Sequence, residues 1–238
     1  MPFTYFRTKG FFLEEKEDRK DSRIFTVFTR DFGRIKVFGK AIRKIKSKLR
    51  AGTEIFSLSE IEFIQGKVYK TLTDAVLIDK FKNLKIENNK FQIASKISKD
   101  INNLVHGEEK DDKIWQLLKE TFQKLNLNLE ISGWQVEIIY YYFYWNLISI
   151  LGYKPELYYC YICHKKLYKE NIYLFSKENG IICQSCFQKM DKVNKELYSN
   201  ININTIKVLR IILKKDWKTL QYLKIKQEDK NNLNYLLN

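Results

Sequence analysis

The first third of the chain alternates between apolar and polar residues, which is the pattern of strands that bury one face. The alternation predicts strands over residues 4–9, 23–29, 34–38, 55–64 and 68–76. Residues 14–18, Glu-Glu-Lys-Glu-Asp, predict a solvated acidic loop between the first two strands. Short antiparallel strands in this number predict an OB-type β-barrel in residues 1–77, although an SH3-like barrel would give almost the same pattern.

From residue 78 onward, apolar residues recur every three or four positions, which predicts an all-α domain over residues 78–238. The first helical stretch opens at Ile78, and Asp112 is the expected N-cap of the next helix. A helix over 134–151 is apolar nearly all round, so its run of aromatic residues, 140–144, is expected to pack in a core. Gly152 and Pro155 end it, and further helices are predicted over 188–197, 205–214 and 229–237.

The four cysteines of the chain form two C-x-x-C pairs with nineteen residues between them. This spacing matches a tetrahedral zinc site of four thiolates. Residues 171–175 predict a strand and 178–180 a turn, so a hairpin would bring the second pair back to the first. We therefore expect one structural Zn²⁺ per chain in a zinc knuckle, residues 156–190, inserted in the helical domain. Its predicted ligands are Cys160, Cys163, Cys183 and Cys186.

Other uses of the cysteines fit less well. Two disulfides in a secreted domain are disfavoured, because residues 2–7 show no apolar secretory core and the cysteines are close in pairs. A redox role is disfavoured because two pairs in a hairpin favour metal. His164 follows Cys163 directly, but four thiolates already fill the metal's coordination shell. A zinc enzyme is not expected, because the only other histidine is His106 and neither H-x-E nor H-E-x-x-H occurs.

The chain carries 43 lysines and arginines against 28 acidic residues, a net charge of +15. Such an excess predicts a polyanionic partner, most often nucleic acid. The charge concentrates between residues 34 and 50, which hold eight basic residues and no acid. Strand alternation places Arg34, Lys36 and Phe38 on one face, where cations can neutralise phosphates and the ring can stack on a base. The predicted DNA-binding residues are Arg34, Lys36, Phe38, Lys40, Arg43, Lys44, Lys46, Lys48 and Arg50.

Three motifs carry a resemblance that covers essentially the whole chain. They are the basic segment 39–49 after the third strand, Leu-Thr-Asp-Ala at 72–75, and Leu-Gly-Tyr-Lys-Pro-Glu-Leu at 151–157 ahead of the first C-x-x-C. In this order they resemble the bacterial RecO family of DNA repair proteins, which are recombination mediators. Members often have glycine where this chain has His164, and Gly-Gly where it has Gly180-Ile181.

The one candidate membrane segment, 134–151, contains Gln135, Glu137 and Asn146, so we expect a cytoplasmic protein with no membrane partner. The resemblance implies a non-enzymatic, nucleoid-associated protein. It implies binding to single- and double-stranded DNA and annealing of complementary strands. With RecR, such a protein helps load RecA onto DNA coated by single-stranded DNA-binding protein, whose acidic C-terminal tail is a further partner. From composition alone, an RNA- or ribosome-associated zinc protein stays open, because phosphate contacts carry most of the affinity for either nucleic acid.

Overall fold

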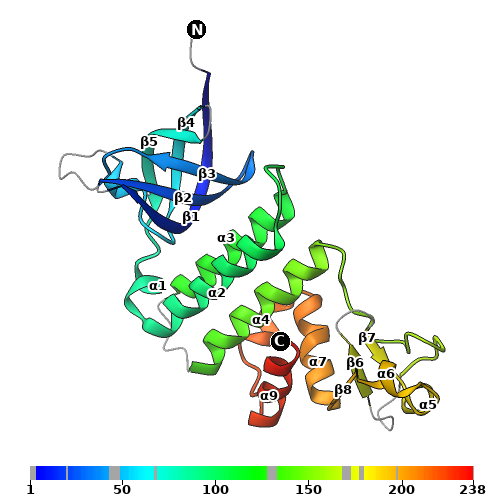
Figure 1. Ribbon diagram of the computed structural model, residues 1–238. Coiled ribbons are helices and arrows are strands. Elements are labelled where there is room, and N and C mark those ends of the chain that lie inside the picture. Colours follow the sequence, from blue (N-terminus) through cyan, green and yellow to red (C-terminus); the bar gives the residue numbers. More distant parts are fainter. Residues whose placement is uncertain are drawn as a thin grey trace. The chain divides into compact units, whose positions relative to one another are not determined.

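The computed structural model describes residues 4–19, 21–42, 49–66, 69–127, 133–167, 173–176, 180–196 and 198–237. The chain forms two compact units, Met1–Tyr140 and Tyr141–Asn238 (Figure 1). The first unit contains the barrel and the helices that follow it, and the second contains a small three-stranded sheet and the remaining helices.

The barrel consists of β1 (Tyr5–Arg19), β2 (Ser22–Thr29), β3 (Gly33–Gly39), β4 (Leu58–Gln65) and β5 (Lys70–Asp79). It is closed in the order β1-β2-β3-β5-β4, with β1 also pairing with β4. All pairs are antiparallel except β3 with β5, where Val37 lies opposite Lys70 and Phe38 opposite Thr71. The predicted five-stranded, OB-type barrel is confirmed by this closure.

The interior of the barrel is filled by one face of each strand. Its core includes Phe12 and Phe25, whose rings pack edge to face at 5.2 Å, together with Val27, Ile35 and Phe63. Fully burying an aliphatic or aromatic side chain of this size contributes roughly 1.5–3 kcal/mol, so the alternating apolar positions stabilise the barrel strongly.

The acidic segment 14–18 is not the predicted loop. It lies in the second half of β1, where Glu17 is the register partner of Arg23. Glu17 Oε1 forms an ion pair with Arg23 Nη2 at 3.0 Å. Register shifts between Phe12 and Glu14 and between Glu17 and Arg19 interrupt the alternation here. Since this half of β1 extends into solvent, its polar residues belong to an exposed strand, and the sequence pattern could not distinguish that strand from a loop.

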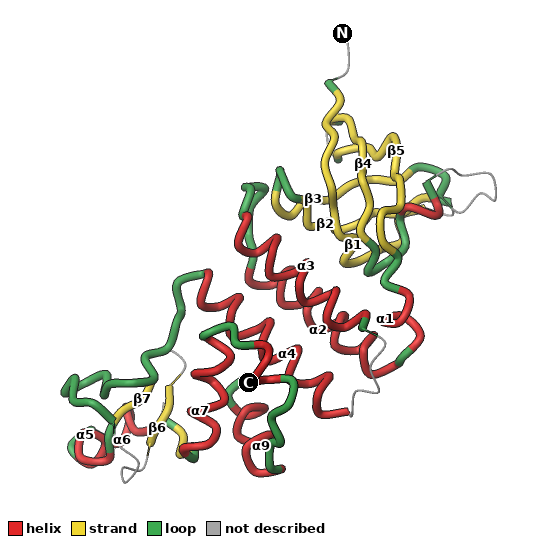
Figure 2. The backbone as a smooth tube through the Cα atoms, turned by 180° about the vertical axis from the view of Figure 1, so that it is seen from behind, coloured by secondary structure: helices red, strands yellow, loops and turns green. Residues whose placement is uncertain are grey.

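The first unit continues with η1 (Arg50–Gly52), α1 (Lys82–Ile86), α2 (Asn88–Leu104) and α3 (Asp112–Asn126). β5 runs to Asp79, so the helical stretch expected to open at Ile78 begins only at Lys82. The N-cap of α3 is Asp111 and not Asp112: its Oδ1 accepts the amides of Lys113 and Ile114, each at 2.9 Å. Figure 2 shows α2 and α3 running side by side.

Aromatic side chains on the outside of the barrel hold these helices in place. Phe11 is fully buried outside the barrel core, with ring centroids 4.9 Å from Trp115 and 5.3 Å from Phe122. Phe81, just before α1, stacks on Phe11 at 6.1 Å and meets Phe122 edge to face at 5.7 Å. One sector of the barrel is therefore covered by helices, and any ligand must use another sector.

α4 (Gly133–Ile150) is apolar nearly all round, as predicted, and Tyr141, Tyr142 and Phe143 from its aromatic run are buried. Packing, and not base stacking, is thus confirmed for these rings. Gly152, at φ +98°, ends the helix in the left-handed conformation predicted for it. Among the described residues, no helix is both long and apolar enough to cross a membrane.

In the second unit, β6 (Tyr173–Ser176) pairs with β7 (Gly180–Ile182) on one edge and with β8 (Ser199–Ile201) on the other. The predicted hairpin is confirmed, and its tip, 177–179, lies outside the described residues. The helix predicted over 188–197 is wrong: α5 (Gln184–Gln188) ends there and Asp191 caps a new short helix, α6 (Lys192–Lys195). The other helices are α7 (Ile203–Leu213), α8 (Trp217–Leu220) and α9 (Gln227–Tyr235).

Candidate metal centre and nucleic-acid interface

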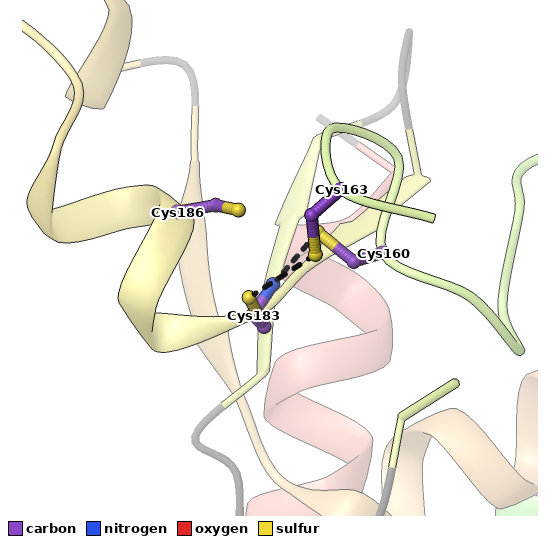
Figure 3. Close-up of side chains that lie close together, drawn as sticks. All are labelled: Cys160, Cys163, Cys183 and Cys186. Atoms are coloured by element: carbon purple, nitrogen blue, oxygen red, sulfur yellow. Dashed lines mark hydrogen bonds between the residues drawn. The ribbon is translucent and has the colours of Figure 1, made fainter. Parts of the chain in front are cut away.

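The four cysteines come from two short structures that face each other (Figure 3). Cys160 and Cys163 lie in a tight turn, in which the Cys160 amide donates to Lys165 O at 2.9 Å. Cys183 is the residue before α5 and Cys186 lies in its first turn, with the Cys186 amide donating to Cys183 O at 3.1 Å. Each C-x-x-C pair thus uses one turn of backbone to direct two sulfurs to one point.

The sulfur atoms form a compact group that fits a tetrahedral metal. All four Sγ atoms lie within 4.8 Å of one another, and Cys163 Sγ is 3.9 Å from Cys183 Sγ. Zinc–sulfur bonds of about 2.3 Å would place tetrahedral sulfurs about 3.8 Å apart. All four cysteines are free of disulfides, and His164, whose side chain is exposed, is not a member of this group in the described part of the chain. The predicted ligand set is therefore brought together.

The electrostatics of the group favour a bound cation. Burial raises the pKa of the Cys160 thiol, but the backbone amides of Cys163, Cys183 and Ile162 outweigh this effect and bring the pKa down to about 7. For Cys186, burial and the three neighbouring sulfurs act in the same direction and raise the pKa to about 12. Thiols this close cannot all ionise unless a positive charge lies among them, and a divalent metal supplies that charge.

The backbone of the knuckle shows which of the resembled family's glycine positions require glycine in this chain. His164 adopts φ +55° and its amide donates to Cys160 O at 2.9 Å, so this position favours glycine. Gly180 adopts φ +84°, and a Cβ there would come within 2.4 Å of Glu156 O. Ile181 next to it is buried in β7 and does not have a positive φ. Only the first position of the Gly-Gly pair therefore requires glycine here.

The predicted DNA-binding residues of the third strand lie on the outside of the barrel. Ile35 and Val37 are buried in the core, whereas Lys36 is exposed and Arg34 and Phe38 are partly exposed. The predicted alternation of this strand is confirmed. Lys40 and Arg50 are also exposed. The remaining predicted residues, Arg43, Lys44, Lys46 and Lys48, lie outside the described residues.

A cavity of about 320 Å³ opens on this outer face of the barrel. Arg34 and Lys36 line it from β3, Gln65 from the end of β4, Lys70 from the start of β5 and Tyr69 from the position before it, with Gly107 and Glu108 completing the wall. The parallel pairing of β3 with β5 places Lys70 opposite Val37. Lys36, next to Val37, and Lys70 therefore lie close together although they are 34 positions apart in the chain. The cavity therefore combines basic side chains with the exposed ring of Tyr69.

Two of its cations already have protein partners. Lys70 Nζ donates to both carboxylate oxygens of Glu108, at 2.8 and 2.6 Å. Arg34 Nη1 donates to the backbone oxygen of Asn102 at 3.1 Å, which fixes the guanidinium against the end of α2. Lys36 thus offers its charge to solvent, whereas Arg34 has a structural contact as well.

Comparison with known families gives matches to both parts of the chain. Residues 1–81 match the family model described as recombination protein O N terminal, and residues 89–238 match recombination protein O C terminal. The chain belongs to the RecO family of DNA repair proteins. Among curated relatives, the DNA repair protein RecO of Dehalococcoides mccartyi (strain CBDB1) is 32% identical over 226 residues, which cover 94% of this chain and 84% of the relative.

More distant RecO proteins match over a similar length. The one from Caldanaerobacter subterraneus subsp. tengcongensis is 26% identical over 93% of this chain and 85% of its own. The one from Halalkalibacterium halodurans is 24% identical over 98% of this chain and 87% of its own. The resemblance predicted from the motifs is therefore confirmed, and the chain is a RecO-family DNA repair protein throughout its length.

Sequence reasoning missed five residues of the barrel cavity, which are Gln65, Tyr69, Lys70, Gly107 and Glu108. The signal was present in part, because the run Tyr69-Lys70 places a ring beside a cation at the start of a predicted strand. What the pattern did not contain was the partner of that strand, since the alternation of a strand does not specify which neighbour it pairs with.

Proposed function

We propose that this RecO-family protein binds single- and double-stranded DNA on the outer face of its barrel and anneals complementary strands. The observation that carries the proposal is the row of outward side chains on β3, Arg34, Lys36 and Phe38, beside the cavity that adds Tyr69 and Lys70. Lysine and arginine neutralise phosphates and release counterions, and exposed rings stack on unpaired bases. Two strands that carry like charges can then approach each other on one protein surface.

We further propose that the protein, together with RecR, helps load the recombinase RecA onto DNA coated by single-stranded DNA-binding protein, in the cytoplasm at the nucleoid. No catalytic step is assigned to the chain, because four thiolates would fill the coordination shell of zinc and leave no open position for a substrate. One Zn²⁺ per chain, held by the four cysteines, would then have a structural role.

A groove in the second unit supports contact with the acidic tail of single-stranded DNA-binding protein. The groove has a volume of about 320 Å³ and lies between α7 and the segment before α9. Val208, Ile211 and Leu223 give it an apolar floor, while Lys207 and Lys224 stand at its rim. An acidic peptide with apolar side chains matches both features. A Lys207→Glu variant should lose binding of the tail peptide and keep binding of free DNA.

The direct test of the function is a competition between a single-stranded DNA and an RNA of equal length, followed by an annealing assay with complementary DNA strands. We expect DNA to compete at least as well as RNA, and we expect the protein to accelerate annealing. A strong preference for RNA, or no acceleration of annealing, would favour the alternative of an RNA- or ribosome-associated barrel protein.

A further inference from the structure

A second surface rich in aromatic and basic side chains lies in the second unit, around the first C-x-x-C pair. Four tyrosines in residues 153–161 are exposed to solvent, with relative exposures of 69% for Tyr153, 40% for Tyr158, 47% for Tyr159 and 49% for Tyr161. The adjacent side chain of Ile162 is also exposed. Exposed clusters of large side chains mark contact surfaces more often than chance, because leaving them in water is unfavourable.

The backbone of the knuckle places the ring of Tyr159 and the cation of Lys166 on the same side. Tyr159 and Lys166 are opposite partners in an antiparallel bridge, so their side chains leave the hairpin on one face. The amide of Tyr161 donates to Ile181 O at 2.9 Å, which anchors this part of the turn to β7. Since Cys160 lies between the two tyrosines and points into the metal group, the metal centre would fix the positions of both rings.

A cationic cavity of about 260 Å³ lies beside Tyr158. Tyr158 forms one wall and stacks on the guanidinium of Arg210 at 4.5 Å, while Arg210 Nε donates to Leu157 O at 3.0 Å. Lys154 and Lys214 line the same cavity. Among the described residues that line it, the one acid is Glu156, whose Oε1 accepts the amides of Tyr158 and Tyr159 at 2.7 and 3.2 Å.

We infer that this face of the knuckle, Tyr153–Lys166 with Lys214, binds single-stranded DNA. The cavity cations would hold the phosphodiester backbone, and the tyrosines beside it would stack on unpaired bases. This combination of a positively charged groove with stacking rings is what single strands require, whereas the bases of a duplex are already stacked on each other. A protein partner would also use tyrosines, but the lysines on both sides of the rings favour a polyanion.

The inference rests on the proposed DNA-binding function and adds to it a role for the metal centre beyond folding. The knuckle would present a second DNA-binding surface on the same chain, separate from the barrel face. Two such surfaces joined in one protein raise the effective concentration of a strand at one surface once it is bound at the other.

The test uses the full-length, metal-loaded chain and measures affinity for a single-stranded DNA and for a duplex of equal length. A Tyr159→Ala/Tyr161→Ala variant should bind the single strand about fivefold or more weakly for each base that loses its stacking partner. Duplex affinity should be nearly unchanged. The matched control, Tyr159→Phe/Tyr161→Phe, keeps both rings and should bind single strands like the parent. Metal content and melting temperature are measured for each variant.

A second variant covers the case in which the alanine protein does not fold. Lys154→Gln/Lys214→Gln removes two cations of the cavity and no ring, and its plot of log affinity against log salt should be flatter by about 1.4 for single strands. If metal-loaded alanine and glutamine variants both bind single strands like the parent, the inference is wrong, the barrel function stands, and the face is left for a protein. If the parent itself binds no DNA, the proposed function fails as well.

Discussion

Lys70 on the barrel donates to both carboxylate oxygens of Glu108. One of the cations that face the cavity is therefore already paired with an acidic side chain. A phosphate entering this cavity has to compete with that carboxylate. Replacing Glu108 by Gln should therefore tighten DNA binding by about two- to fivefold, since an ion pair whose acid is exposed to solvent is worth up to about 1 kcal/mol. Titration of labelled single strands at low salt measures the change.

The matched control is Glu109→Gln, which removes the same charge from the next residue, one that does not line the cavity. Its effect on affinity should be clearly smaller than that of Glu108→Gln. Equal effects of the two substitutions would mean that only the net charge of the loop matters and that the contact with Lys70 has no special role.

The left-handed backbone of His164 predicts a stabilising substitution. A side chain at φ +55° is strained relative to glycine by roughly 1 kcal/mol. Glycine relieves this strain, but its greater conformational freedom in the unfolded chain offsets part of the gain in stability. His164→Gly should therefore raise the free energy of unfolding by a few tenths of a kcal/mol to about 1 kcal/mol. Lys165, which does not have a positive φ, is the control, and Lys165→Gly should destabilise the chain. Equilibrium unfolding in urea distinguishes the two directions.

The metal centre predicts a loss of stability when one ligand is removed. Cys183→Ser takes one sulfur from a group whose members lie within 4.8 Å of one another, and should lower the metal content well below the one Zn²⁺ per chain proposed above. The melting temperature should fall by several degrees, and a strong chelator should do the same to the parent. Ser185→Ala, in α5 between the two ligands, serves as the control. A chelator-treated parent that kept its melting temperature would refute the structural role.

Asp100 predicts that stability falls as the pH rises through a defined range. Burial raises the pKa of its carboxyl to about 6, against the opposing effects of a hydrogen bond from Tyr140 and the charge of Lys96. Its Oδ2 has no hydrogen-bond partner among the described residues. Between the unfolded pKa of 3.8 and about 6, the folded state binds more protons at Asp100 than the unfolded state does. The free energy of unfolding therefore falls as the pH rises through this range and stays lower above pH 6.

Asp100→Asn should remove this pH dependence. After allowance for solvent screening, we expect the variant to be more stable than the parent by about 1 kcal/mol at pH 8 and by less at pH 5. Urea unfolding at the two pH values gives both differences. The exposed acid Asp21 provides the control, and Asp21→Asn should change stability equally at both. The same stabilisation from Asp100→Asn at pH 5 and pH 8 would contradict the raised pKa of Asp100.

Much of this architecture was predictable because it depends on local patterns. The alternation of Ile35 and Val37 with Arg34 and Lys36 fixed which face of β3 points outward, and the C-x-x-C spacing fixed the metal group. Pairing was not predictable in the same way. The contact of β3 with β5 brings Lys70 to Lys36, and it depends on how the whole barrel closes. The second half of β1 was predicted as a loop for a related reason, because its charged residues show no alternation with core-facing apolar residues.

The central claim is that the outer face of β3 and its cavity hold the DNA backbone. Its most direct test is the salt dependence of single-stranded DNA affinity for the parent and for Lys36→Gln/Lys70→Gln. The control, Lys99→Gln/Lys113→Gln, removes two exposed cations from α2 and α3. We predict a plot of log affinity against log salt that is flatter by about 1.4 for the barrel variant and nearly unchanged for the control. A barrel variant with the slope and affinity of the parent would contradict the account.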